Sequence, residues 1–126
     1  MENYTQLFRQ NPDAYRADLA STQNSLGILY YNLHDYAKSE EYYLKALENK
    51  TQLFNQNPDA YRASVASTQW NLMLLYANME NWEKYDDMLE KALKNYEELA
   101  RRNSQYQEDV ENLRKRKEQR TAEKGQ

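Results

Sequence analysis

The chain has 126 residues, 29% of them charged, a net charge of −3 and a mean hydropathy of −1.19. It contains only two Gly, two Pro and no Cys, which excludes a fold built on tight turns or on disulfides and favours an all-α protein. No apolar run approaches the ~20 residues of a membrane span, and Met1–Gln10 is too polar for a signal peptide, so we expect a cytoplasmic protein with no membrane association.

The chain repeats itself with a period of 46 residues, the offset between residues 5 and 51. TQLFRQNPDAYRA at 5–17 returns as TQLFNQNPDAYRA at 51–63, with Arg9 replaced by Asn55. The match continues at the same offset, because ASTQ at 20–23 returns at 66–69 and KAL at 45–47 returns at 91–93. Such a period is typical of stacked supersecondary units. We therefore expect one domain over 1–126, with repeats at 12–57 and 58–103.

The first segment, Tyr4–Asn11, matches only the end of a repeat. It predicts a helix over 3–11, so that residues 1–11 form the end of a truncated repeat. Two origins stay open: the chain could be a piece of a longer array, or it could carry a short N-terminal cap.

Apolar residues at helical spacing predict helices over 16–33 and 35–57 in the first repeat. The break lies near His34, and Asp35 can cap the second helix by accepting from free backbone N–H groups. Pro12 and Pro58 disfavour helix at the residue before them, so helices should end near 11 and 57. The stripes consist of Leu19, Leu26, Tyr30 and Leu33, and then of Tyr36, Tyr43, Ala46, Leu47, Lys50, Leu53 and Phe54.

The second repeat predicts helices over 62–79 and 81–103, with Asn81 in the capping position. EELARRN at 97–103 is similar to TQLFRQN, after which the sequence diverges. Tyr106, Val110 and Leu113 form a thin apolar stripe, which predicts a capping helix over 104–122, with its helical part at 105–122. A terminal repeat needs a polar outer face because nothing stacks on it. Residues 123–126 are expected to be a frayed tail.

The pattern resembles the tetratricopeptide repeat family, in a long-period variant of bacterial type. The family's small and large crossing positions match Leu26-Gly27, Tyr30, Asp35-Tyr36, Ser39, Tyr43 and Ala46, and in the second repeat Leu72, Tyr76, Leu89 and Ala92. Met73 replaces the Gly and Tyr85 the small residue, which predicts looser packing there. The usual repeat has about 34 residues and ends in Pro, whereas Thr51 and Glu97 occupy that position here, so the second helix runs on.

The resemblance implies a right-handed superhelical stack of antiparallel helix pairs, about two and a half repeats long, whose first helices line a concave groove. It implies a protein–protein interaction scaffold that binds a peptide or protein segment in that groove, with Trp70 as anchor. The matching groove positions are Ser21, Asn24, Ile28, Tyr31 and Asn32 in the first repeat, and Ser67, Trp70, Leu74, Ala77 and Asn78 in the second. A clamp for a terminal carboxylate is argued against, because 16–33 and 62–79 contain no Lys and only Arg16 and Arg62 at their starts.

Two other interpretations stay open. The groove residues could meet a neighbouring helix or another copy of the chain instead of a ligand. The chain could also be a structural fragment of a longer array that forms a homo-oligomer through its truncated N-terminal end, with Leu7, Phe8, Tyr15 and Leu19 facing the partner chain.

Enzyme chemistry finds little support in the sequence. His34 is the only His and falls at a turn, and the paired carboxylates lie on long polar faces, so we expect no catalytic residue, no metal and no cofactor. Residues 101–126 carry eight Lys or Arg and five Asp or Glu, which leaves −6 on the first hundred residues. That acidic body argues against nucleic acid, and the basic run 114–117 is interpreted as part of a solvated cap.

Overall fold

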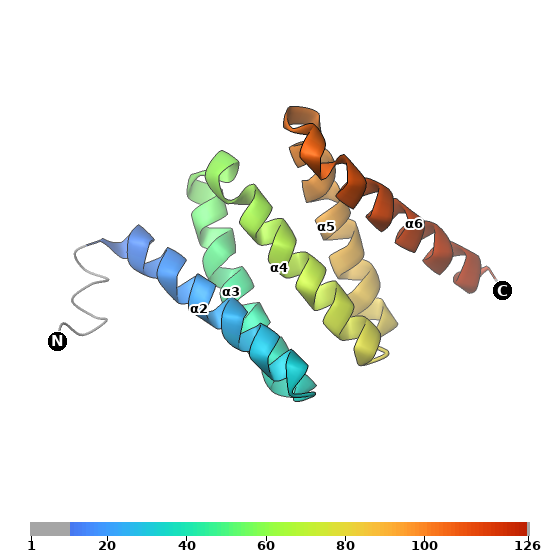
Figure 1. Ribbon diagram of the computed structural model, residues 1–126, viewed down its shortest axis with the longest axis horizontal. Coiled ribbons are helices and arrows are strands. Elements are labelled where there is room, and N and C mark those ends of the chain that lie inside the picture. Colours follow the sequence, from blue (N-terminus) through green and yellow to red (C-terminus); the bar gives the residue numbers. More distant parts are fainter. Residues whose placement is uncertain (1–10, 126) are drawn as a thin grey trace. The chain divides into compact units, whose positions relative to one another are not determined.

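The computed structural model describes residues 11–125, and this part of the chain is all-helical, with five α-helices and no strand (Figure 1). None of these helices is both long enough and apolar enough to cross a membrane. The described residues divide into two compact units, one ending at Tyr61 and the other beginning at Arg62, within the first turns of α4. The elements are α2 (Pro12–Asn32), α3 (Tyr36–Gln56), α4 (Pro58–Asn78), α5 (Trp82–Arg102), the 3₁₀ turn η1 (Ser104–Tyr106) and α6 (Gln107–Lys124).

Two first helices begin four residues earlier than predicted, at Pro12 and Pro58 instead of 16 and 62. The prediction used proline only as a stop signal. Proline is favoured in the first turn of a helix, where its missing N–H would have no partner in any case. Asn11 completes this start, because its side-chain oxygen accepts from the backbone N–H of Ala14 at 3.2 Å, and Asn57 accepts from Ala60 at 3.3 Å.

The helix ends predicted near residues 34 and 80 are confirmed, and so are both caps. Asp35 accepts from the backbone N–H of Lys38, and Asn81 accepts from that of Lys84, both at 3.2 Å. The residues before these caps, His34 and Glu80, have positive φ values of 61° and 56°. This left-handed residue ends each first helix and lets the chain turn back into the second helix of the pair.

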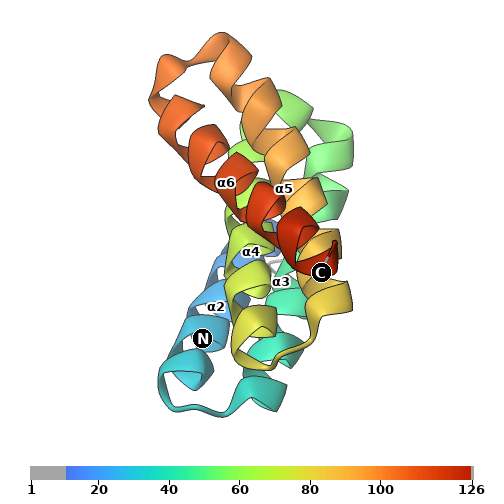
Figure 2. The same ribbon diagram turned by 90° about the vertical axis from the view of Figure 1, so that its right-hand side faces the viewer.

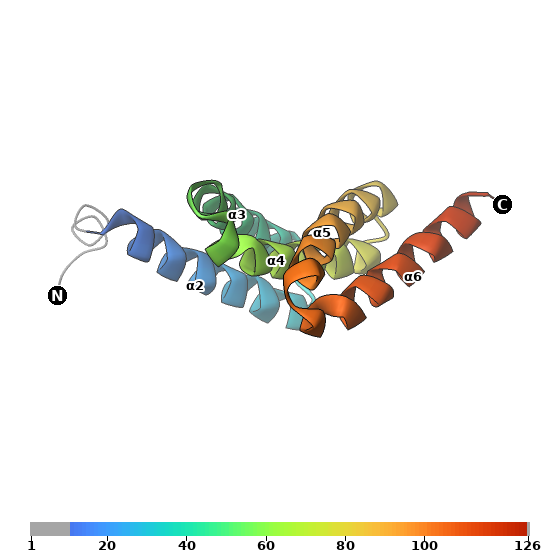
Figure 3. The ribbon, with the colours of Figure 1, turned by 90° about the horizontal axis from the view of Figure 1, so that it is seen from above.

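In the first unit, α2 and α3 run antiparallel and pack side by side (Figures 1 and 3). Gly27 makes the close approach possible, because a Cβ at this position would lie 2.5 Å from Cδ1 of the buried Tyr43 ring. The Ser39 hydroxyl donates to the Gly27 carbonyl at 2.7 Å. Gly27, Ser39 and Tyr43, which match the small and large positions of the repeat pattern, are therefore in contact in this helix pair.

In the second unit, the replacements at these positions are buried as well. Met73 is 0% exposed and Tyr85 is 4% exposed, and Leu89, which replaces Tyr43, is 2% exposed. The predicted loosening is therefore not accompanied by exposure of these side chains. Of the three replacements only Leu89 is smaller than its counterpart, and it leaves room beside the larger Met73, which stands in place of Gly27.

A polar triad is built twice at the 46-residue offset. Asn49 accepts from Arg16 Nη1 at 2.9 Å and donates to Gln23 Oε1 at 2.8 Å, which ties α3 to α2. The corresponding bonds among Arg62, Asn95 and Gln69 measure 3.0 and 2.8 Å and tie α5 to α4. Each Asn side chain thus supplies hydrogen bonds to an Arg and a Gln side chain, which replace bonds to water that these groups lose in a partly buried place.

The C-terminal helix differs from its prediction at both ends. Residues 104–106 form η1, and α6 then continues to Lys124, so residues 123 and 124, predicted to fray, are helical. Val110 and Leu113 are buried as expected, and α6 packs on α5 (Figure 2). The predicted helix over 3–11, and most of the truncated repeat at 1–11, lie outside the described residues.

Candidate functional site

In the first unit, the predicted groove residues share one face of α2. Asn24, Ile28, Tyr31 and Asn32 follow at steps of 4, 3 and 1, which keeps them on one side of a helix. Ile28 is 42% exposed and Asn32 is exposed, whereas Asn24 and Tyr31 are half-buried. The Tyr31 ring lies 5.9 Å from the ring of Tyr36 at the start of α3.

In the second unit, the corresponding face of α4 carries Trp70, Leu74 and Asn78. Trp70 and Leu74 are half-buried and Asn78 is exposed. The Trp70 ring meets the ring of Tyr96 edge-on, with centroids 5.7 Å apart, so part of it belongs to the packing of α4 on α5. The Asn78 amide donates to the Leu74 carbonyl at 3.0 Å, so one of its two N–H donors is engaged within the helix.

The first helices lack charge to an unusual degree for this chain. No charged residue occurs in Leu19–Leu33 of the α2 region or in Ala63–Met79 of the α4 region. The second helices carry charged pairs on their surfaces instead, with Lys45 Nζ 3.7 Å from Glu41 and Lys91 Nζ 3.0 Å from Asp87. A helix face exposed to water is normally polar and charged. Within Ala63–Met79 most residues are buried or half-buried, so the missing charge there reflects packing, whereas the uncharged face of α2 exposes Ile28 and is a candidate for contact with another molecule.

The predicted apolar stripe of α2 is less buried than its copy in α4. Leu19, Leu26 and Tyr30 are half-buried and Leu33 is 63% exposed, whereas Val65, Leu72 and Tyr76 are 5%, 0% and 2% exposed. Of the residues predicted for self-association, Tyr15 and Leu19 are half-buried, and Leu7 and Phe8 lie outside the described part of the chain.

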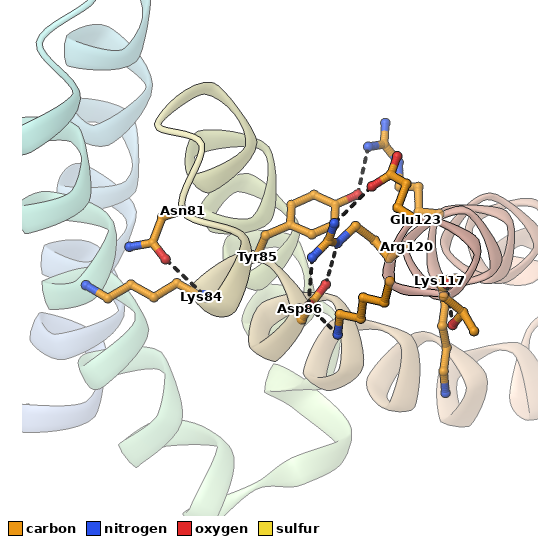
Figure 4. A network of polar contacts seen from close by, with 10 residues as sticks. Asn81, Lys84, Tyr85, Asp86, Lys117, Arg120 and Glu123 are labelled. Atoms are coloured by element: carbon orange, nitrogen blue, oxygen red, sulfur yellow. Dashed lines mark hydrogen bonds and ion pairs between the residues drawn. The ribbon is translucent and has the colours of Figure 1, made fainter. Parts of the chain in front are cut away.

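A cluster of charged and aromatic residues joins the end of α6 to the start of α5 (Figure 4). Arg120 donates from Nε and Nη2 to the two Asp86 carboxylate oxygens at 2.8 and 3.1 Å, and Lys124 Nζ lies 2.7 Å from Asp86. The Arg120 guanidinium also lies 4.9 Å from the Trp82 ring centroid. The hydrogen bonds between Arg120 and Asp86 lower the pKa of the Asp86 carboxyl and raise the pKa of the Arg120 guanidinium. Both groups are therefore held in their charged forms as a structural ion pair.

Sequence reasoning missed both this cluster and the polar triads. The triads could have been found from the repeat, because Arg16, Gln23 and Asn49 are each identical to the residue 46 positions later. The Arg120 cluster could not be found in this way, because its partners Trp82 and Asp86 have no identical counterparts in the first repeat.

An open cavity in the second unit lies along α5 and α6 and has a volume of about 590 Å³. Two of the charged side chains that line it form ion pairs, with Arg114 3.2 Å from Glu97 and Lys117 3.0 Å from Glu90. It is lined by Leu93, Glu97, Arg114, Lys117, Glu118, Thr121 and Ala122.

Among residues 11–125, no group of three His, Cys, Asp or Glu side chains is placed to hold a metal ion. His34 is exposed at its turn, as predicted, with Nδ1 2.9 Å from the Tyr36 hydroxyl. The most perturbed lysine is Lys50, which is 8% exposed, and burial lowers its pKa to about 8. Lys50 occupies the position of the buried Tyr96 in the second unit, which explains its place on an apolar stripe.

Comparison of the chain with protein-family models, with curated proteins and with solved structures gives no match.

Proposed function

We propose that the chain is a protein-binding scaffold of the tetratricopeptide type, which holds a peptide or protein segment against the uncharged faces of its first helices. The observation that carries this proposal is the absence of charge from Leu19–Leu33 and Ala63–Met79 in a chain that is 29% charged. Ile28 adds a large apolar side chain that is 42% exposed on the first of these faces.

The ligand should be apolar or aromatic in its contact residues. A carboxylate or phosphate ligand needs cationic donors, and the two uncharged runs contain none. Exposed Asn32 offers an amide that can pair with a ligand backbone, which would fix the position of a segment held mainly by apolar contact. A scaffold function is also consistent with the ion pairs of Arg120 with Asp86 and of Arg114 with Glu97, because binding an apolar segment does not require these charged groups to be free.

The test uses affinity capture from a lysate of the source cells with immobilised chain. Ile28→Asp is the probe and Leu44→Asp is the matched control, because Leu44 is 41% exposed in the same unit but lies on α3. A partner retained by wild type and Leu44→Asp and lost by Ile28→Asp supports the proposal. A partner retained equally by all three, or lost equally by both variants, contradicts it. Circular dichroism confirms that each variant remains helical.

A further inference from the structure

The Arg120 side chain is held on α5 by contacts that together recognise a guanidinium group. Its Nε and Nη2 atoms donate to the two carboxylate oxygens of Asp86 at 2.8 and 3.1 Å (Figure 4). Its guanidinium carbon lies 4.9 Å from the Trp82 ring centroid and 6.0 Å from that of Tyr85. The two rings meet edge-on at 74°, with centroids 5.2 Å apart, and form two walls of a corner. We call Trp82, Tyr85 and Asp86 the guanidinium site.

This arrangement suits an arginine side chain better than a lysine side chain. A planar guanidinium donates two parallel hydrogen bonds to one carboxylate, whereas an ammonium is a compact point charge without this fork. A guanidinium also lies favourably over an aromatic ring while its N–H groups reach a carboxylate beside that ring. The guanidinium site is therefore matched to the shape of arginine as well as to its charge.

The guanidinium site is particular to the second unit. The residues 46 positions before its three members are Tyr36, Ser39 and Glu40. A serine thus stands where the second ring of the corner would be, and its hydroxyl donates to the Gly27 carbonyl at 2.7 Å. The pairing of two helices in this repeat therefore does not by itself require a guanidinium site.

The stretch of α6 that carries Arg120 is otherwise held lightly on α5. After Leu113, no described residue of α6 is buried. Two ion pairs with side chains 38–56% exposed also join this stretch to α5, Arg114 with Glu97 and Lys117 with Glu90. Exposed ion pairs of this kind contribute little to stability. Opening of the second half of α6 therefore requires little more than the release of its cations from Asp86.

The guanidinium site is open to solvent and keeps its negative charge when α6 leaves. Trp82 is 42% exposed with Arg120 in place, and the Asp86 side chain is 24% exposed. Lys124 Nζ also lies 2.7 Å from Asp86, and because both cations belong to α6 they leave together. A carboxylate beside two aromatic rings then has lost its partners, which favours the binding of another cation.

We propose that the guanidinium site binds an arginine side chain of another protein, which displaces Arg120 together with the second half of α6. Arg120 is then an intramolecular occupant of the site, and the end of α6 is an autoinhibitory element, because docking of α6 and binding of the other arginine exclude each other. The site lies on α5, so it is separate from the uncharged face of the first helices.

Hydrogen exchange of the wild-type chain tests whether Arg120 can be displaced. N-acetyl-arginine amide is the competitor, and N-acetyl-lysine amide at the same concentration and ionic strength is the control. A ligand of the open state multiplies its population by 1 + [L]/Kd, so a competitor at twice its dissociation constant should speed exchange about threefold. We expect this in peptides covering 114–124, with the arginine amide only and with no change in α2 and α3. In Asp86→Asn, the arginine amide should have no more effect than the lysine amide.

Arg120→Gln vacates the guanidinium site, so that binding can be measured directly. The indole N–H resonance of Trp82, identified by its loss in Trp82→Phe, should shift saturably with the arginine amide and much less with the lysine amide. Circular dichroism confirms that each variant remains helical. No shift in Arg120→Gln overturns the proposal, and so do equal effects of the two amides or an arginine effect that persists in Asp86→Asn. A shift in Arg120→Gln without faster exchange in the wild-type chain also overturns it, because Arg120 would then not be displaced.

Discussion

Gly27 is the residue on which the close packing of the first helix pair depends most directly. Replacing it by Ala should favour the helix by ~1 kcal/mol through backbone propensity. The new Cβ would lie 2.5 Å from Cδ1 of Tyr43, a ring that is only 3% exposed and has little room to move, and overpacking of this kind costs ~1–3 kcal/mol. We expect Gly27→Ala to lower the free energy of unfolding by ~1 kcal/mol, measured by urea denaturation.

The second repeat supplies the control for this prediction. Tyr43→Leu introduces the residue found at Leu89, so the double variant Gly27→Ala/Tyr43→Leu should lose less than the two single variants predict together. A Gly27→Ala chain at least as stable as the wild type would show that the helices separate at no cost.

Lys50 should make stability depend on pH in the alkaline range. Its pKa is lowered from 10.5 to about 8 by burial, so between these values the unfolded chain binds more protons than the folded chain. Stability therefore rises with pH from about 8. Above pH 10 the trend reverses, because burial raises the pKa of Tyr43 and of Tyr96 from 10.0 to about 12 and the folded chain then binds more protons.

Lys50→Met removes the lysine while keeping a long side chain, and it should abolish the rise between pH 8 and 10 and leave the fall above pH 10. Thermal unfolding at a series of pH values measures both slopes. Lys45→Met is the control, because Lys45 is exposed on the same helix and should leave the rise intact. An unchanged rise in Lys50→Met would mean that another group titrates there.

At the scale of the element, α6 is attached differently along its length. Its first half contributes the buried Val110 and Leu113, whereas its second half is anchored by the contacts of Arg120 and Lys124 with Asp86. Arg120 has a side chain only 14% exposed although it is charged, which follows from its place between Asp86 and the Trp82 ring. The end of α6 should therefore depend on one polar cluster instead of a continuous apolar seam.

Arg120→Gln should speed amide hydrogen exchange in the second half of α6 severalfold and leave α2 and α3 unaffected. Lys115→Gln removes the same charge from an exposed position of the same helix and should leave exchange near the wild-type rate. Mass spectrometry of peptides covering 114–124 provides the measurement. Equal acceleration in the two variants would show that net charge, not the contact with Asp86, holds this end.

The helix boundaries show which local rules could be read from the sequence. The caps at Asp35 and Asn81 were predictable because short polar side chains before an apolar run accept from free N–H groups. The starts at Pro12 and Pro58 were misplaced because proline both stops a preceding helix and suits the first turn of the next. The continuation of α6 to Lys124 was missed because local rules do not include the contact of Arg120 with Asp86, which lies 34 residues away in the chain.

At the scale of the whole chain, the 46-residue period predicted two helical hairpins and a final helix, and these are found in residues 11–125. The period could not show that equal sequences receive unequal burial. Leu26 and Leu29 are partly exposed, whereas their copies Leu72 and Leu75 are inaccessible to solvent, because burial is set by neighbours in space and not by the local pattern. For the same reason, the apolar stripe predicted on the first helix is only partly buried, and Leu33 at its end is 63% exposed.

The central claim is that the uncharged face of the first helices binds another protein. Isothermal titration of the captured partner against wild type, Ile28→Asp and Leu44→Asp tests this claim most directly. The account predicts that Ile28→Asp weakens binding by at least ~30-fold, as expected for a contact residue worth ~2 kcal/mol, while Leu44→Asp stays within about twofold of wild type. Equal affinities for the two variants would contradict it and would place the function on another surface of the chain.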